Sequence, residues 1–254
     1  MQGRCLWVIL AVYLGILIFS CSSSSKRVLV QPTAIKGAEP VGMETCLLCH
    51  EDIVKNFKYT AHARLHISLD NREVLGCESC HGEGSLHLEV GGGKGQYIIN
   101  PGRNPTVCYQ CHLGVKMAFN FQYHHPVREG RMNCINCHDP HGENIYRAKG
   151  MRIGRENDVC MQCHQDQTRP RVFEHEALRE GCTICHRPHG SINDKMLVEN
   201  DNNLCLKCHA QIAMPNSVTI GDFSHTTRLA QGTCWSAGCH TAVHGSNINP
   251  HLRY

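Results

Sequence analysis

Residues 124–142 read HHPVREGRMNCINCHDPHG, and two features of this stretch recur along the whole chain. The first is a C-x-x-C-H element, which occupies residues 134–138. The second is a pair of flanking histidines: His124 or His125 before the element and His141 directly after it. The chain has 18 cysteines and 19 histidines in 254 residues, and much of its 41% apolar content is cysteine or lies in the first twenty residues. Something other than apolar side chains must therefore fill the interior.

C-x-x-C-H is the attachment signature of c-type haem: two thiols form thioethers with one porphyrin, and the adjoining histidine becomes the proximal iron ligand. The chain has seven regular copies and one stretched copy, C-x4-C-H. The predicted attachment cysteines and proximal histidines are Cys46, Cys49 and His50; Cys77, Cys80 and His81; Cys108, Cys111 and His112; Cys134, Cys137 and His138; Cys160, Cys163 and His164; Cys182, Cys185 and His186; Cys205, Cys208 and His209; and Cys234, Cys239 and His240. We refer to them as motifs 1 to 8 in chain order, and they predict eight covalently bound haem c groups.

Zinc is the alternative for such cysteine pairs, because C-x-x-C also occurs in zinc sites and in thioredoxin-like redox centres. The sixteen motif cysteines would suffice for four zinc sites of four cysteines each. That interpretation leaves the histidine after every pair without a reason, so haem is favoured.

Two kinds of motif alternate along the chain. Motifs 1, 3, 5 and 7 have no other histidine close by, and we call them plain; motifs 2, 4, 6 and 8 have one upstream and one downstream histidine, and we call them flanked. Eight haems with two axial histidines each need eight distal ligands, and the flanked motifs supply eight. The predicted distal ligands are His62 (or His66), His125 (or His124), His175 and His225 upstream, and His87, His141, His189 and His244 downstream. His251 is left without a role.

A downstream histidine a few residues past the proximal ligand cannot reach the far face of its own haem, because the backbone there is already tied to the iron. We therefore expect each of these histidines to ligate a neighbouring haem and so to connect its own motif to that haem. The stretched motif 8 has the same layout, since His225 stands nine residues before Cys234 as His125 stands nine before Cys134. Without it, seven haems would face eight distal ligands.

The N-terminal stretch MQGRCLWVILAVYLGILIFSC has a basic start and an apolar run that is typical of an export signal. With the serine run that follows, it resembles a bacterial lipoprotein processing site, which would make Cys21 the lipid-bearing residue. Ordinary cleavage and an uncleaved anchor are the alternatives. We expect a signal peptide at 1–20, a flexible tether at 21–40, and an octahaem domain of four two-haem repeats at 41–254.

The expected fold is mostly coil with short α-helices wrapped around a stacked chain of haems, with little or no β-sheet. Helical segments are expected at 44–58, 156–166, 174–181 and 201–212, each near a motif, and no alternating strand pattern is evident. The formal charge is only +3, and no run of basic residues is interleaved with aromatic residues, so the sequence gives no indication of nucleic-acid binding.

The stretches HHPVREGRMNCINCHDPHG, EHEALREGCTICHRPHG and CHTAVHGSN resemble the periplasmic multihaem cytochromes of porin–cytochrome conduits and of extracellular DMSO respiration. Those decahaem proteins have ten haem motifs, whereas this chain has eight. The resemblance implies electron transfer from periplasmic donors to outer-membrane or extracellular acceptors such as metals. It also implies other multihaem cytochromes and a β-barrel porin as partners, and a periplasmic location, here lipid-anchored to the outer membrane.

Two other functions fit parts of the pattern. A multihaem reductase of a nitrogen or sulfur oxyanion needs an open distal position, whereas every motif here ends in histidine and every haem has a second candidate ligand. We therefore predict that the chain is not an enzyme. A cytochrome that self-associates into extracellular filaments is not excluded, and the surplus His66, His124 or His251 would then be available as ligands across an interface.

Overall fold

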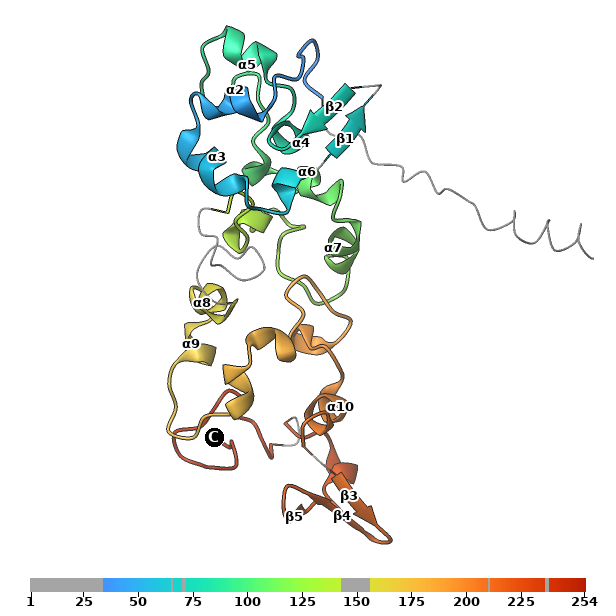
Figure 1. Cartoon of the computed structure of the whole chain (residues 1–254). Coiled ribbons are helices and arrows are strands. Elements are labelled where there is room, and N and C mark those ends of the chain that lie inside the picture. Colours follow the sequence, from blue (N-terminus) through green and yellow to red (C-terminus); the bar gives the residue numbers. More distant parts are fainter. Residues whose placement is uncertain (1–33, 65, 70–71, 143–155, 210, 236–237) are drawn as a thin grey trace, which may run out of the picture. The chain divides into compact units, whose positions relative to one another are not determined.

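The fold is a coil interrupted by short helices (Figure 1), as the sequence predicts. The computed structural model describes residues 34–64, 66–69, 72–142, 156–209, 211–235 and 238–254, all of which belong to one compact unit spanning 31–254. The α-helices are α2 (Met43–Leu47), α3 (Glu51–Phe57), α4 (Glu78–His81), α5 (Ser85–Glu89), α6 (Thr106–Tyr109), α7 (Leu113–Ala118), α8 (Glu156–Met161), α9 (Gln165–Thr168) and α10 (Asp201–Leu206). The 3₁₀ segments are η1 (His62–Arg64), η2 (Pro101–Arg103), η3 (Cys134–Asn136), η5 (Glu176–Arg179), η6 (Cys182–Ile184), η7 (Asp194–Met196) and η8 (Leu229–Gln231).

Three of the four plain motifs share one local conformation. In motifs 1, 3 and 5 a helix runs into the motif, the proximal histidine leaves the helical region, and a second helix begins at the next residue, whereas in motif 7 strand β3 follows α10. The histidine has φ/ψ of −117°/41° at His50, −90°/55° at His112 and −98°/53° at His164. The expected helix at 44–58 is therefore two helices, α2 and α3, that are interrupted at the histidine.

Flanked motifs 4 and 6 differ from the plain ones, because they fold as single 3₁₀ turns, η3 and η6, whereas flanked motif 2 contains the helix α4. The expected helix at 174–181 is likewise a 3₁₀ segment, η5. A tight turn brings the chain back on itself within a few residues, so the downstream histidine can leave the motif in a new direction.

Five short strands form two small antiparallel sheets. Strand β1 (His66–Leu69) pairs with β2 (Arg72–Leu75), and β3 (Gln211–Met214), β4 (Ser217–Ile220) and β5 (Phe223–Ser224) form the second sheet. The helix predicted at 201–212 is wrong at its C-terminal end, because α10 ends at Leu206 and residues 211–214 form β3. Asn216 has a positive φ of 66° and turns the chain into β4, whose β-branched residues favour a strand. The prediction of little β-sheet is confirmed.

The polypeptide has a small apolar core of its own. Among the described residues, the buried apolar side chains are Ala38, Val54, Phe57, Phe119, Val127, Val159 and Ala242. The largest fully buried side chain belongs to Ser246. A chain of this length ordinarily buries far more apolar surface, so its stability depends on something besides side-chain packing.

The N-terminal segment of the described chain docks onto motif 2. The Ile35 N–H donates to the Glu83 carboxylate (3.0 Å), and the N–H groups of Val41 (2.9 Å) and Gly42 (3.0 Å) donate to Glu78. Ile35 belongs to the expected tether, whereas Val41 and Gly42 are the first residues of the expected octahaem domain. The expected signal peptide, Cys21 and the tether residues up to 33 lie outside the described residues. Within the described part of the chain, no helix is both long and apolar enough to span a membrane.

The same backbone bridge joins flanked motif 4 to motif 6 and motif 6 to motif 8. Tyr123 and Ser191 exchange two N–H···O=C bonds (3.2 and 2.8 Å), and Phe173 and Ser246 do the same (2.8 and 2.9 Å). In each case the first residue stands two before an upstream histidine, and the second stands two after the downstream histidine of the next flanked motif. The bridge therefore fixes the two distal histidines relative to each other.

The glycines after His189 and His244 permit this close approach. Gly190 has a φ of +148°, and a Cβ there would lie 2.1 Å from the Ala118 carbonyl oxygen. Gly245 has a φ of +111°, and its Cβ would lie 3.1 Å from the Phe173 carbonyl oxygen. Any side chain at these positions would push the neighbouring backbone away.

Substitution of Gly190 by alanine tests this junction. We expect Gly190→Ala to lower the free energy of unfolding by about 2 kcal/mol or more, because backbone strain and a backbone clash add. The matched control is Gly130→Ala, which has a positive φ of +73° but no atom within 4 Å of the new Cβ, so only the strain of about 1 kcal/mol applies. Thermal unfolding followed by circular dichroism measures both, and equal losses would contradict a close-packed junction.

Candidate haem-binding sites

Seven pairs of predicted iron ligands face each other. The ring centroids are 6.1 Å apart for His62–His112, 5.9 Å for His81–His141, 6.0 Å for His125–His164, 5.9 Å for His138–His189, 6.1 Å for His175–His209, 6.2 Å for His186–His244 and 6.5 Å for His225–His240. Two imidazoles on opposite sides of one metal ion have centroids about 6.2 Å apart, given metal–nitrogen bonds of about 2.0 Å. Each pair thus has the separation that a shared iron requires.

The ring nitrogens of these histidines are divided between two tasks. Nδ1 lies within hydrogen-bond distance of a backbone carbonyl oxygen in His81 (Ile99, 2.8 Å), His125 (Pro188, 2.7 Å), His175 (Val243, 3.0 Å), His186 (Lys195, 2.8 Å), His225 (Phe223, 3.0 Å) and His240 (His251, 2.7 Å). A carbonyl accepts only from N–H, so Nδ1 carries the proton and the lone pair of Nε2 is available to bind a metal ion. Metal-ligating histidines typically hold this tautomer through such a bond.

Several of the paired imidazoles are kept neutral by their surroundings. The pKa lies below the usual value, first because burial penalises the charged ring and then because of a neighbouring imidazole, in His62, His81, His189 and His244. The neutral ring is the form that binds a metal ion.

The structure distinguishes His125 from His124. The Nδ1 of His124 is 2.6 Å from the Phe121 carbonyl oxygen, and its Nε2 is 3.0 Å from the Glu129 carboxylate. The hydrogen bond to Glu129 raises the pKa of His124, which favours a protonated ring with no free nitrogen. His125 instead faces His164 through an uncommitted Nε2.

The remaining surplus histidines have different surroundings. His62 faces His112, whereas His66 lies on β1. The ring of His251 packs against Phe223 at a centroid distance of 5.2 Å, and its carbonyl oxygen accepts from the proximal His240.

The pairs follow a rule. An upstream histidine faces the proximal histidine of the next plain motif, as His125 faces His164. A downstream histidine faces the proximal histidine of the preceding flanked motif, as His189 faces His138. The C-terminal end departs from the rule, because no plain motif follows and His225 faces His240 of its own motif.

His50 and His87 are the two predicted ligands left over. Neither has a ring contact among the described residues, and the Nδ1 of His87 lies 2.8 Å from the Gln96 carbonyl oxygen. They occupy the N-terminal end of the series, where no earlier flanked motif exists.

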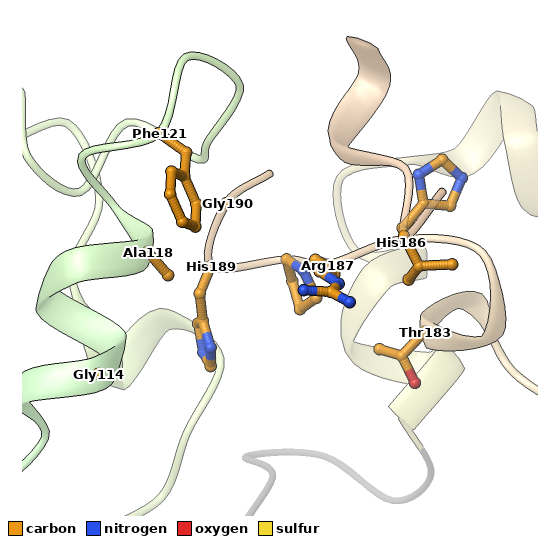
Figure 2. Close-up of a pocket in the computed structure, with 10 residues that line it drawn as sticks. Gly114, Ala118, Phe121, Thr183, His186, Arg187, His189 and Gly190 are labelled. Atoms are coloured by element: carbon orange, nitrogen blue, oxygen red, sulfur yellow. The ribbon is translucent and has the colours of Figure 1, made fainter. Parts of the chain in front are cut away.

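Figure 2 shows how one motif serves two partners. His186 and His189 project in different directions from the same turn, with Arg187 between them. They line a cavity of about 520 Å³ whose other wall includes Gly114 and Ala118 of α7. Neighbouring motifs are therefore built around shared spaces rather than separate pockets.

The motif cysteines of neighbouring motifs lie close together. Hydrogen bonds join the first cysteines of motifs 1 and 2 and of motifs 3 and 4; in the second pair, the bond to Cys108 lowers the pKa of Cys134 to about 7. The second cysteines interact between motifs 2 and 3, 4 and 5, and 6 and 7. No disulfide joins the motif cysteines, and the described residues hold no group of three or more potential metal-ligating side chains.

Two kinds of supporting residue escaped the sequence analysis. The Asn157 side-chain oxygen accepts from the backbone N–H of Cys182 (3.0 Å), and Asn202 does the same for Cys234 (3.1 Å). Each asparagine stands three residues before the first cysteine of the preceding plain motif, a repeated position that the sequence does reveal. These bonds connect adjacent motifs.

The serine of the recurring HGS triplet is the second kind. Ser191 and Ser246 are 4% and 1% exposed, and each hydroxyl donates to a backbone carbonyl 2.6 Å away. The loops they hold carry the carbonyls of Lys195 and His251, which accept from the proximal His186 and His240. The serines therefore help to orient the proximal rings.

Several polar atoms in these sites have no protein partner. The Tyr109 hydroxyl, the Ser79 hydroxyl and the Arg171 Nε are buried without a hydrogen bond. Buried polar atoms are nearly always bonded, so these atoms fit a polar edge of a bound group, such as a porphyrin propionate. Together with the paired rings and unbridged thiols, the residues present fit haem c.

Comparison with known proteins agrees with this chemistry. The family described as "Doubled CXXCH motif" matches residues 124–169 and 175–214, and each match spans one flanked motif and the plain motif after it. "Multiheme cytochrome MtrA" of Shewanella baltica (strain OS185) is 30% identical over 206 residues, or 80% of this chain and 57% of that protein. The chain thus spans little more than half the length of this curated relative.

A solved structure, "Undecaheme cytochrome from S-layer of Carboxydothermus ferrireducens", is 16% identical, with a TM-score of 0.13. It covers 60% of this chain and 27% of its own.

Replacement of His125 and of its neighbour His124 tests the facing pairs. If facing rings are the two axial ligands of one iron, His125→Ala leaves one haem five-coordinate and high-spin, whereas His124→Ala leaves every haem low-spin. EPR spectra of the oxidised holoproteins measure the high-spin fraction. A high-spin signal in the His124 variant alone would reverse the assignment.

Proposed function

We propose that the chain is a multihaem c-type cytochrome that binds eight haem c groups covalently and transfers electrons along them. The observation that carries the proposal is the set of seven facing histidine pairs, six of which join two different motifs. A protein that binds separate haems for separate tasks has no need to build each site from two motifs.

We assign the axial ligands by these pairs. Each proximal histidine holds the iron of its own motif, and the facing histidine is the distal ligand. His87, as the remaining candidate, is assigned to the haem of motif 1 opposite His50. The stretched motif 8 is a full site, because His225 faces His240 as the other pairs do.

The ligand set favours electron transfer over catalysis. Bound haem supplies one-electron chemistry, and ligation by two histidines leaves no iron position for a substrate. The histidines of this chain fill both axial positions, and their carbonyl partners hold the rings in place. This speaks against a reductase of nitrogen or sulfur oxyanions.

The contacts between cysteines support an order for the haems. The first cysteines meet within motifs 1–2 and 3–4, and the second cysteines meet within motifs 2–3, 4–5 and 6–7. We infer that the haems follow one another in chain order, with two alternating kinds of junction. Electrons would then enter near one end of the chain and leave near the other.

The physiological role is proposed by analogy with the relative named a multihaem cytochrome. The chain would relay electrons between periplasmic donors and outer-membrane or extracellular acceptors, together with other cytochromes and a β-barrel porin. An export signal and a lipid at Cys21 would hold it at the outer membrane. Ligation across a filament interface is disfavoured for His124, because both its ring nitrogens already have partners.

The haem count has a direct test. Replacing Cys234 and Cys239 with alanine is expected to lower the mass of the holoprotein by one of eight haems, because both thioethers of motif 8 are lost. Mass spectrometry under denaturing conditions measures the covalent haem. An unchanged mass would remove motif 8 from the set, and a wild-type mass with fewer than eight haems would contradict the octahaem proposal.

Isolation of the tagged chain from outer membranes in mild detergent tests the conduit role. We expect a β-barrel protein and a second multihaem cytochrome in stoichiometric amounts. A wash at high salt concentration removes proteins that bind the chain only through surface charge, and it serves as the control. Recovery of the chain alone, with its full haem content, would contradict a stable conduit while leaving electron transfer intact.

A further inference from the structure

Motif 2 differs from the others in the residue after its first cysteine. Glu78 is the only acidic residue between the cysteines of any of the eight motifs. Its side chain is 3% exposed, in α4, directly between the two predicted haem-attachment residues Cys77 and Cys80. A buried acid in this position is unexpected, since a charge removed from water costs free energy unless it is hydrogen-bonded.

Backbone N–H groups surround the carboxylate of Glu78. Its Oε1 accepts from the N–H groups of Val41 (2.9 Å) and Gly84 (2.9 Å), and its Oε2 accepts from Gly42 (3.0 Å). All three partners are hydrogen-bond donors, which match the acceptor oxygens of a carboxylate. Backbone N–H groups stabilise the carboxylate without cancelling its charge, and within the described part of the chain Glu78 has no basic side chain as a partner.

A second buried carboxylate lies on the other side of the proximal histidine. Glu83 is 6% exposed, and its Oε2 accepts from the Ile35 N–H at 3.0 Å. It too has no basic partner among the described residues. His81 is therefore bracketed by two buried negative charges, three residues before it and two after it.

The charge of Glu78 extends to the attachment cysteines. The pKa of the Cys46 thiol is raised, first by its hydrogen bond to Cys77, then by burial and by the charges of Cys77 and Glu78. The carboxylate therefore lies close to the first attachment cysteines of motifs 1 and 2. Buried charges are screened far less than exposed ones, so this effect persists at physiological salt.

We propose that Glu78, supported by Glu83, lowers the reduction potential of the haem held by Cys77, Cys80 and His81. Reduction takes one electron from the donor and turns ferric iron into ferrous iron, which lowers the charge of the haem by one. A fixed anion nearby stabilises the more positive ferric form, so it opposes that step. The N-terminal end of the haem series then receives electrons only from strong donors.

The inference rests on the proposed function in one respect, that motif 2 binds a haem ligated by His81. It does not depend on a porin, on a membrane anchor or on the number of other haems. Its test therefore uses the isolated holoprotein.

The test is a spectroelectrochemical titration of Glu78→Gln beside the wild type. We expect one haem's part of the total absorbance change to occur at a higher potential in Glu78→Gln than in the wild type. The difference is expected to persist at high salt concentration. The matched control is Glu51→Gln, which removes an exposed carboxylate directly after the proximal His50. Because water screens that charge, the control curve is expected to overlay the wild type.

Glu83→Gln separates charge from structure. The Glu78→Gln substitution places an amide NH₂ group against backbone N–H groups and can disturb the fold. The Glu83→Gln substitution can keep the hydrogen bond from the Ile35 N–H, because the amide oxygen still accepts it. We expect Glu83→Gln to raise the potential of the same haem. The proposal would be overturned if Glu83→Gln carried its full haem content by mass and its reduction potentials were unchanged. Unchanged potentials in a fully haem-loaded Glu78→Gln protein would overturn it as well. Loss of haem from wild-type motif 2 would instead contradict the proposed function.

Discussion

The two nitrogens of the imidazole ring impose the constraint on which this structure depends. In His125, Nδ1 is bonded to the Pro188 carbonyl, and this leaves Nε2 facing the ring of His164. The carbonyl belongs to the residue directly before His189, which is itself a member of the His138 pair. One ring therefore depends on three motifs: its own, the motif whose proximal histidine it faces, and the motif whose backbone orients it. His175, bonded to the carbonyl before His244, repeats the arrangement. A site cannot be assembled correctly unless its neighbours are assembled as well.

This interdependence compensates for the small apolar core. The described residues bury few apolar side chains, yet the flanked motifs are tied by paired backbone bonds at Tyr123–Ser191 and Phe173–Ser246. Glycines at 190 and 245 let the backbones approach closely, and buried serines at 191 and 246 hold the loops that orient the proximal rings. These polar contacts set directions rather than supply most of the stability. Covalent haem, which ties two cysteines and two histidines at each site, would provide the remainder, so haem loading and folding are expected to be one process.

Spacing along the chain was enough to predict the motifs, the two alternating kinds and the set of candidate ligands. It was not enough to predict which rings meet. The choice between His124 and His125 depends on a carbonyl 63 residues away and on Glu129, neither of which a local pattern contains. Strands β3 to β5 were missed because none exceeds four residues, too few for an alternating pattern to stand out. The docking of residues 35–42 on Glu78 and Glu83 was missed because buried acids in this segment have no sequence signature.

In the first and in the last flanked motif, one distal histidine has a different kind of hydrogen-bond partner from the upstream histidines of the interior motifs. In the interior, an upstream histidine takes its carbonyl partner from the next flanked motif, as His125 and His175 do. For His225 the partner is instead the Phe223 carbonyl in β5, two residues before the histidine itself. His87 similarly bonds within its own region, to Gln96. Removing one interior flanked motif with the plain motif after it would take away two proximal histidines and two distal ones. By the pairing rule, every remaining histidine would still have a partner. Repeats of this kind can therefore be gained or lost in whole units without a break in the pairing rule.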